Sequence, residues 1–204
     1  MQTVIYTEDV APAAQLLRRG ELAAVPTETV YGLGANALDG GAVRLIFEAK
    51  GRPETKPISL FVCDIDEAEE LCEEIPEEAY ALARRFWPGP LTMIFRKSEA
   101  VPELLTAGGD TVGLRCPDNE ITIRLLESCG VPLTGTSANL SGEPSASTAD
   151  EVLDSFAGKI GAVLLGEKAG GGVPSTVLDM TSAPPRILRQ GGVTAAEIES
   201  VIGR

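Results

Sequence analysis

Residues 22–34 read LAAVPTETVYGLG, and in this stretch a short apolar strand runs into a polar loop. Leu22–Val25 is the strand, and Pro26 marks its end. The loop that follows is rich in hydroxyl groups, and Gly32 and Gly34 are spaced for tight backbone turns. Because open α/β sheets bind ligands where a strand feeds such a loop, the stretch predicts an α/β fold with a ligand site here. A polar turn without a ligand is the alternative, and a P-loop is excluded because its GxxxxGK signature is missing.

Outside this stretch the chain alternates between strand-like and helix-like segments. We expect strands at 4–6, 58–62, 91–95, 111–116, 131–134, 162–165, 176–180 and 186–188. We expect helices at 9–19, 42–50, within 64–78, 77–86, 119–128, 148–157 and from 194, the last two opened by the capping boxes Thr148/Glu151 and Thr194/Glu197. This order predicts a layered α/β architecture with a mixed sheet. With 204 residues and no linker-like change in composition, residues 1–204 are expected to form a single domain.

The chain has 30 acidic and 17 basic residues, which gives a net charge of −13 and argues against a protein that coats nucleic acid. Nine of the acids lie in residues 64–78. Apolar residues recur there at helical spacing, so a surface helix with a solvated acidic face is favoured over metal binding or partner docking. The chain has no apolar run near 18 residues and no secretory signal in its first residues, so we expect no membrane span and a cytoplasmic location.

Histidine and cysteine usage narrows the chemistry. The chain contains no histidine, which excludes Ser-His-Asp and Cys-His catalysis and histidine-based zinc sites. The four cysteines form no CxxC motif and are expected to be buried free thiols. An enzyme of this composition works through Lys, Arg, Ser, Thr, carboxylates or backbone amides.

A basic segment, KGRPETKP at 50–57, follows the helix expected at 42–50. A cation at a helix C-terminus complements the helix dipole, which accounts for Lys50 but not for Arg52 and Lys56 beyond the helix. The guanidinium fork of arginine and the point charge of lysine both suit phosphate groups. The segment therefore favours anion binding.

Three further segments are rich in small and hydroxyl-bearing residues: TGTSANLSGEPS at 134–145, GGVPST at 171–176 and RQGG at 189–192. Each is an ordinary surface loop if it is taken alone. Small residues let the backbone approach a ligand closely, and hydroxyl groups can donate to it. Arg115, at the end of an expected strand, and Arg189 add positive charge. Together with the basic segment, these loops predict a polar cavity for a polyanion such as a nucleoside triphosphate.

At these residues the sequence resembles the YrdC/YciO family, whose characterised members are threonylcarbamoyl-AMP synthases. The resemblance spans nearly the whole chain and rests on PTETVYGLG, the pair Lys50-x-Arg52, FWPGPLT, TSANLSGEPS, GGVPST and Arg189-x-Gly191, in the family order. It implies a three-layer α/β fold with a twisted, mostly mixed sheet and flanking helices around a polar cavity. The implied reaction joins L-threonine, bicarbonate and ATP, with Mg²⁺ on the phosphates, into threonylcarbamoyl-AMP and pyrophosphate.

The resemblance also implies roles for individual residues. Lys50 and Arg52 are implied to be catalytic, and the threonine pocket is implied to contain Thr29, Tyr31, Arg115, Gly135 and Ser175. The nucleotide is implied to contact Arg52, Lys56, Thr111, Ser137, Asn139, Ser145 and Arg189. No metal-ligating residues are implied. One position departs from the pattern, because Phe61 stands where many members have a histidine near threonine, and a phenyl ring forms no such hydrogen bond.

Three functions are consistent with these residues. The first is the synthase, with tRNA or a tRNA-modifying transferase as partner. The second is a YciO-like paralogue that binds nucleotide or RNA without making threonylcarbamoyl-AMP. The third is a carbamoyl-transfer enzyme that uses a different acceptor. The departure from the family pattern at Phe61 leaves these alternatives to the synthase open. Release of pyrophosphate that depends on threonine distinguishes the synthase from the other two functions.

Overall fold

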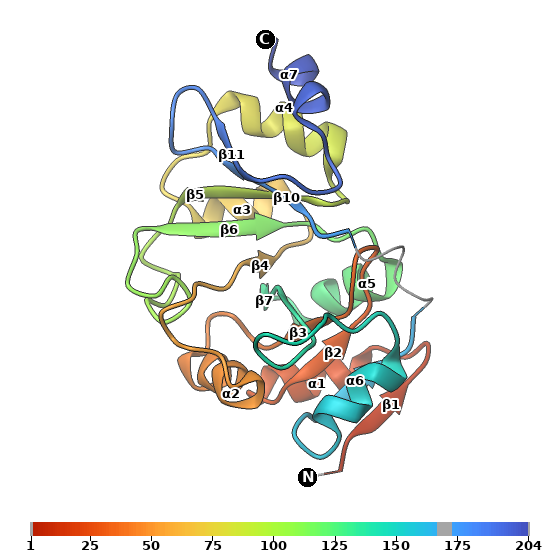
Figure 1. The fold of residues 1–204 in the computed structure, drawn as a ribbon. Helices are drawn as coiled ribbons and strands as arrows, with labels where there is room; N and C mark the ends of the chain where they lie inside the picture. Colours follow the sequence, from red (N-terminus) through yellow and green to blue (C-terminus); the bar gives the residue numbers. More distant parts are fainter. Residues whose placement is uncertain (1, 167–172, 204) are drawn as a thin grey trace.

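The strands form two mixed β-sheets (Figure 1) in a computed structural model that describes residues 2–166 and 173–203. The first sheet has the order β1-β9-β2-β3-β8, with β1 (Val4–Tyr6), β9 (Ala162–Leu164), β2 (Ala23–Val25), β3 (Gly32–Gly34) and β8 (Thr136–Ser137). β1, β9 and β2 run parallel, whereas β3 and β8 are antiparallel to their neighbours. The pairing of Gly32 with Ser137 brings the segments 26–34 and 134–145 together.

The second sheet has the order β11-β10-β5-β6-β4-β7. Its strands are β11 (Arg186–Arg189), β10 (Thr176–Asp179), β5 (Leu91–Arg96), β6 (Thr111–Arg115), β4 (Leu60–Phe61) and β7 (Leu133–Thr134). β10 is parallel to β5 and β4 is parallel to β6, whereas the remaining pairs are antiparallel. β4 and β6 pair in a register that sets Phe61 opposite Arg115. This register decides which side chains meet in the pocket described below.

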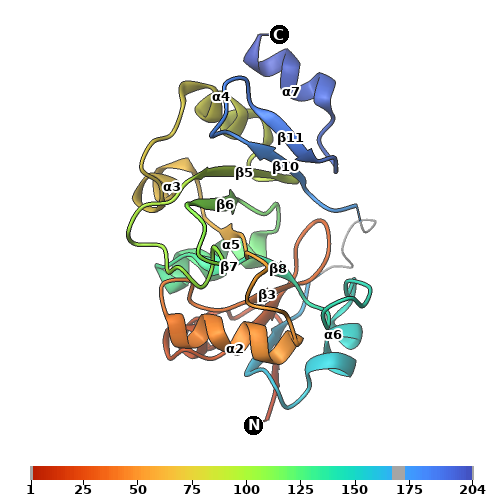
Figure 2. The ribbon, with the colours of Figure 1, turned by 60° about the vertical axis from the view of Figure 1, so that its left-hand side comes forward.

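Seven helices occur in the described ranges: α1 (Ala11–Arg18), α2 (Gly40–Lys50), α3 (Ile65–Leu71), α4 (Glu77–Phe86), α5 (Glu120–Cys129), α6 (Ala149–Phe156) and α7 (Ala195–Ile202). The predicted capping box of α7 is confirmed, with Thr194 and Glu197 exchanging hydrogen bonds. At α6 the Thr148 side chain caps the helix as expected, but the Glu151 carboxylate accepts from Ser147 instead of closing the box. Figures 1 and 2 show α4 and α7 at the C-terminal end of the molecule and α2 near the N-terminal end.

The acidic segment forms a shorter helix than residues 64–78 allow. α3 ends before Cys72, which is extended and forms a β-bridge with Lys97, and the next amide, that of Glu73, donates to the Arg96 carbonyl at 3.1 Å. Pairing with the end of β5 therefore replaces the last turns of the expected helix. Pro76, which follows, cannot continue a helical ladder.

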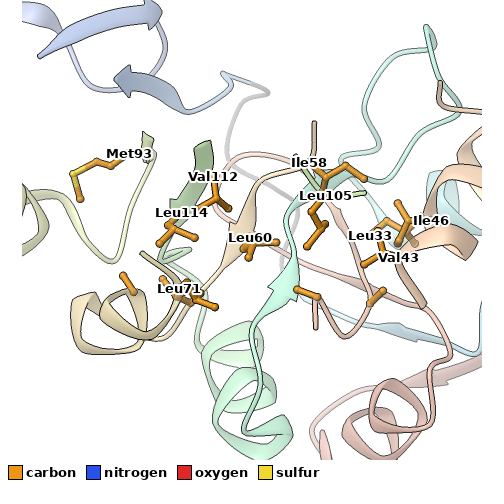
Figure 3. Close-up of a cluster of buried hydrophobic side chains, with 14 of the residues drawn as sticks. Leu33, Val43, Ile46, Ile58, Leu60, Leu71, Met93, Leu105, Val112 and Leu114 are labelled. Carbon is orange, nitrogen blue, oxygen red and sulfur yellow. The ribbon is translucent and has the colours of Figure 1, made fainter. Parts of the chain in front are cut away.

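Alternation along the strands of the second sheet separates a core face from a face of mixed polar and apolar residues. Leu60, Met93 and Leu114 are fully buried in a cluster that also takes residues from α2, α3, α4 and β3. Figure 3 shows this cluster extending from Leu71 and Leu114 through Leu60 to Val43 and Ile46. The core thus joins the two sheets, and the alternate residues of β4, β5 and β6 point away from it.

The predicted mixed α/β architecture is confirmed, but the strands form two sheets where the sequence analysis expected one. β3 and β8 were not predicted, because both lie in Gly-, Thr- and Ser-rich stretches that are typical of loops. The first residues of the GGVPST motif, Gly171 and Gly172, lie outside the described residues. Within residues 2–166 and 173–203, no helix has the length and apolar character needed to cross a bilayer.

Candidate active site

A pocket of about 450 Å³ lies on the face of the second sheet opposite the core face. This volume falls in the range of small-molecule sites. β4, β5, β6 and β10 contribute to it, together with β8 of the first sheet and the loops around residues 29, 52–59 and 174. Its polar lining consists of Thr29, Arg52, Ser59, Thr92, Thr111, Arg115, Thr136, Ser137, Ser145, Ser175 and Arg189. Among the described residues that line it there is no carboxylate.

Strand register explains why these side chains meet. Phe61 of β4 is opposite Arg115 of β6, Ile94 of β5 is opposite Gly113 of β6, and Val177 of β10 is opposite Thr92 of β5. Paired residues in a sheet project from the same face, so these side chains share one surface. The residues between them in sequence point into the core instead.

Arg115 is buried, and two of its guanidinium nitrogens, Nε and Nη2, are hydrogen-bonded to protein groups. Its Nη2 donates to a Glu28 carboxylate oxygen at 2.6 Å and to Thr29 Oγ1 at 3.1 Å, and its Nε donates to the Gly89 carbonyl at 3.1 Å. The second Glu28 carboxylate oxygen accepts from the Asp118 amide. In the described part of the chain, Nη1 donates to no protein group. Glu28 therefore compensates the charge and fixes the orientation of a guanidinium that lines the pocket.

Arg52 and Arg189 are held differently, since they meet no carboxylate among the described residues. Arg52 donates to the Pro57 carbonyl at 2.8 Å and to the Lys56 carbonyl at 3.3 Å. Arg189 donates to the carbonyl and the hydroxyl of Ser175, and that hydroxyl is also hydrogen-bonded to Thr92 at 2.9 Å. Burial lowers the pKa of both guanidinium groups, and the charge of Arg115 adds to this for Arg189. Within the part of the chain that the structure describes, both cations therefore lack a counter-ion and are available to an anion.

Lys50, the last residue of α2, is not part of the pocket lining and lies directly behind it, although it was expected to contact substrate. It is 2% exposed, and its ammonium donates to the carbonyls of Ser137 and, at 2.7 Å, of Asn139. Its own carbonyl accepts from the Ser141 amide at 2.8 Å. Burial, and secondarily the nearby charge of Arg52, lowers the pKa of Lys50 to about 8. Lys50 thus ties the loop that carries Ser137 to the end of α2.

Three other predicted site residues also lie outside the pocket lining: Tyr31, Lys56 and Asn139. The buried Tyr31 hydroxyl accepts from the Gly166 amide at 3.1 Å, and burial raises the pKa of this phenol. Asn139 is occupied within its own loop, where its amide donates to the carbonyls of Leu140 and Glu143. Lys56 is exposed. The other predicted residues, namely Thr29, Arg52, Thr111, Arg115, Gly135, Ser137, Ser145, Ser175 and Arg189, line the pocket.

Sequence reasoning gave no role to Glu28, Ser59 or Thr92, and it treated Phe61 only as a departure. Glu28 and Thr92 lie inside the quoted motifs PTETVYGLG and FWPGPLT, so a signal was available for both. Ser59 precedes β4, and its hydroxyl donates to the Gly135 carbonyl at 3.1 Å. A side chain at Gly135 would place its Cβ 3.0 Å from the Phe61 ring, so the close approach of these two segments requires glycine.

The cysteines take no part in this site. Burial raises the pKa of Cys63, Cys72 and Cys116 to about 12 and that of Cys129 to about 11. Their sulfur atoms are therefore thiols at neutral pH and poor nucleophiles. All four are free, as the sequence analysis expected, but only Cys72, Cys116 and Cys129 are buried, whereas Cys63 is partly exposed.

Several known proteins are similar to this chain in sequence and in fold. A threonylcarbamoyl-AMP synthase of Pyrococcus abyssi is 52% identical over 191 residues, which are 94% of this chain and 56% of the relative. The crystal structure of P. abyssi Sua5 complexed with L-threonine superposes with a TM-score of 0.94 at 48% identity, covering 100% of this chain and 61% of that one. E. coli YciO superposes with a TM-score of 0.85 at 26% identity, covering 97% and 98% of the two chains.

This chain therefore spans little more than half the length of its P. abyssi relatives and nearly the whole length of YciO. A family model for Sua5, YciO and YrdC proteins, described as "Telomere recombination", matches residues 15–191. That range includes every pocket-lining residue described above. The chain belongs to the Sua5/YciO/YrdC family.

Proposed function

We propose that this chain makes L-threonylcarbamoyl-AMP and pyrophosphate from L-threonine, bicarbonate and ATP. The observation that carries the proposal is the charge of the pocket. A chain with a net charge of −13 lines this pocket with Arg52, Arg115 and Arg189, and with no carboxylate among its described residues. Such a lining favours a polyphosphate. The P. abyssi relatives, a threonylcarbamoyl-AMP synthase and a Sua5 structure with L-threonine, support the choice of substrates.

The proposal divides the pocket between two substrates. The α-carboxylate of threonine binds the free Nη1 side of Arg115, next to Thr29, Gly135 and Ser175. Arg52 and Arg189 bind the ATP phosphates, because their positive charge has no protein counter-ion among the described residues. The nucleotide also meets the hydroxyl groups of Thr111, Ser137 and Ser145.

The residues behind the lining act indirectly in this proposal. Lys50 positions the loop of Ser137, and Asn139 holds the same loop through its carbonyl contacts. Tyr31 positions the backbone around Gly166. Lys56 is exposed beside the Arg52 segment, where it adds positive charge for an approaching phosphate.

The chemistry needs no protein nucleophile. The amine of threonine attacks the carbon of CO2 derived from bicarbonate, so that an N–C bond forms and a proton is released. A carbamate oxygen then attacks the α-phosphorus of ATP, and pyrophosphate leaves with the electron pair of the broken P–O bond. Holding the two substrates together lowers the entropic part of the barrier. Arg52 and Arg189 stabilise the negative charge that shifts onto the leaving pyrophosphate.

Mg²⁺ accompanies ATP in this proposal. Bound to phosphate oxygens, it neutralises charge and orients the triphosphate. Within residues 2–166 and 173–203, no group of three His, Cys, Asp or Glu side chains is placed to hold a metal ion. The residues present therefore fit an ion whose ligands are mainly phosphate oxygens.

We further propose that residues 1–204 work as one YrdC-like domain and hand the product to a tRNA-modifying transferase. Both ends of the described chain support the first part. β1 pairs with β9 inside the first sheet, and α7 packs on α4 with Ile198 in the main core. The reactive mixed anhydride of the product supports the second part, because it transfers its carbamoyl group to an amine acceptor.

The test is an assay of the purified protein with ATP, Mg²⁺, bicarbonate and L-threonine. We expect release of pyrophosphate that requires both threonine and bicarbonate, and a product with the mass of threonylcarbamoyl-AMP. Arg52→Ala should lower this activity by about 10- to 100-fold, as expected for the loss of a charged hydrogen-bonding group. Arg44→Ala is the matched control, because Arg44 is exposed on α2, forms an ion pair with Glu54 and is not part of the pocket lining. Equal activity of the two variants contradicts the site.

A second function is favoured by one observation. Phe61 lines the pocket at the one position where the sequence departs from the family pattern, and the fold superposes on that of E. coli YciO with a TM-score of 0.85. A nucleotide- or RNA-binding protein without synthase activity also needs a positively charged pocket for phosphate groups, such as the one lined by Arg52 and Arg189. Tight ATP binding with no threonine-dependent pyrophosphate would support it, and pyrophosphate release with another amine would support a carbamoyl-transfer enzyme with a different acceptor.

A further inference from the structure

The ring of Phe61 is a fixed apolar wall of the pocket. It lies between two glycines, so that a Cβ built on either Gly32 or Gly135 would be 3.0 Å from a ring carbon. The residue is 4% exposed and lines the pocket. Packing against Val25, Leu126 and Leu133 in a buried cluster restricts the movement of the ring from this position.

Phe61 also lies next to the residue that receives the amino acid. The Arg115 guanidinium carbon is 5.8 Å from the centroid of the ring, within the range of a cation–π contact. Arg115 uses Nε and Nη2 for protein contacts and leaves Nη1 free among the described residues. An α-carboxylate on Nη1 brings the side chain of the same amino acid to within contact of nearby walls, since only Cα and Cβ separate the two groups.

We infer that Phe61 determines which amino acid the pocket accepts, by presenting an apolar surface to the side chain of the substrate. This inference deepens the proposed function and rests on it for the identity of the ligand class. A phenyl ring makes favourable contact with a methyl group and offers no partner to a hydroxyl group. The hydroxyl groups of Thr29 and Ser59, which line the same pocket, are already hydrogen-bonded within the protein.

The pocket should therefore select its amino acid mainly through contact with the methyl group of the side chain and only weakly through the hydroxyl group. L-Valine has the shape of L-threonine with a second methyl in place of the hydroxyl, and L-serine lacks the methyl. One methyl or methylene in an apolar site is worth about 10- to 200-fold in selectivity, whereas a hydroxyl group is selected strongly only where the site forms a hydrogen bond with it. We therefore expect valine to bind within about 10-fold of threonine, and serine at least about 10-fold more weakly.

Equilibrium binding of the three amino acids to the full chain, by calorimetry, tests this without relying on turnover. The informative variant is Phe61→His, because imidazole keeps a flat ring and adds hydrogen-bonding nitrogens. It should raise the preference for threonine over valine by about 10-fold or more. The imidazole can form a hydrogen bond with the hydroxyl group of threonine, whereas the methyl group of valine leaves it without a partner. Phe61→Leu keeps an apolar wall and should preserve the order of the affinities for threonine, valine and serine. This variant provides a second test if Phe61→His does not fold.

Phe47→Leu is the matched control. Phe47 is a buried phenylalanine of α2, 3% exposed and outside the pocket lining, so its replacement tests the general effect of a smaller core residue. It should leave the ratios of the three affinities unchanged. Serine binding as tightly as threonine, unchanged ratios in Phe61→His, or binding of none of the three amino acids would overturn the inference.

Pyrophosphate release is measured separately with each amino acid. Amino-acid binding in the expected order without pyrophosphate contradicts the proposed synthase and supports the role of Phe61. Threonine-dependent pyrophosphate with affinity ratios that Phe61→His does not alter supports the synthase and overturns the role of Phe61. The two proposals therefore fail in different ways.

Discussion

The pocket contains two kinds of arginine site, and they treat positive charge differently. In the paired site, formed by Glu28, Thr29 and Arg115, the guanidinium lies 2.6 Å from a carboxylate oxygen, and Arg115 as a whole is 7% exposed. In the unpaired sites, Arg52 and Arg189 donate only to carbonyl and hydroxyl oxygens of the described chain. All three side chains line one cavity.

This difference separates structural from ligand-binding charge. A buried arginine that faces a carboxylate adds little net potential, so the paired site suits a zwitterion such as an amino acid. Arginines without a counter-ion keep their potential and suit a polyphosphate. The comparison predicts that losing Arg115 damages the fold as well as threonine binding, whereas losing Arg52 or Arg189 damages mainly the binding of ATP.

The largest effect is expected from Arg115→Met. Removing Arg115 leaves the Glu28 carboxylate, which is 20% exposed, without its counter-ion, and this costs about 3 kcal/mol of the free energy of unfolding, the lower end of the range for buried pairs. Urea denaturation of the variant and the wild type measures this loss. The double variant Glu28→Gln/Arg115→Met should lose clearly less than the sum of the two single variants. Additive losses would show that the two groups stabilise the fold independently.

Arg189→Ala is expected to have a smaller effect, a loss of about 1.5–3 kcal/mol in the free energy of ATP binding. Its effect on the stability of the fold should be minor. The variant should weaken ATP binding by about 10- to 100-fold while its unfolding free energy changes by less than about 1 kcal/mol. Arg186→Ala is the matched control, because Arg186 is on the same strand, β11, but outside the pocket lining. If Arg189→Ala lowers stability as Arg115→Met does, the distinction between paired and unpaired sites is wrong.

Much of this arrangement could be predicted from the sequence alone, because it follows from local patterns such as helical spacing and short motifs. Helix α4 was predicted with its observed bounds, Glu77–Phe86, since its apolar positions repeat at helical spacing up to the turn at Pro88. Thr29, Arg52 and Arg115 were expected in the cavity from their positions in motifs and at strand ends, and all three line the pocket. Their division between substrates stays a prediction.

What the sequence could not supply was the direction of individual side chains. Lys50 and Arg52 are two residues apart and look equivalent in the motif, yet the first points into the protein and the second lines the pocket. Gly51, at φ 58°, ends α2 between them and turns the chain. The strand β3 was missed for a related reason. Its glycines are typical of turns, and only pairing with β2 and β8 makes the segment extended.

Lys50 gives a test of moderate size, because its charge is buried without a carboxylate partner among the described residues. The pKa of Lys50 is lowered by burial from 10.5 to about 8, so between these two pH values the unfolded chain binds a proton that the native chain lacks. The unfolding free energy contributed by this group therefore rises with pH in that window. We expect the stability of the wild type relative to Lys50→Met to increase by about 1 kcal/mol from pH 8 to pH 9. A difference that is flat or falls with pH would place the charge of Lys50 in a solvated environment.

The smallest effect concerns salt and separates the two kinds of site most directly. Mobile ions screen an exposed, uncompensated charge, and the Debye length falls from about 10 Å at 0.1 M to about 3 Å at 1 M salt. ATP held by Arg52 and Arg189 should therefore bind several-fold more weakly at 0.3 M than at 0.05 M NaCl. Threonine on the paired site should change by less than about twofold, because it is a zwitterion and Glu28 already compensates Arg115 at close range. Calorimetric titration of each ligand at both salt concentrations measures the contrast. Equal salt dependence for the two ligands would mean that threonine is recognised by the uncompensated charge of the pocket as a whole, and the paired site would then have a purely structural role.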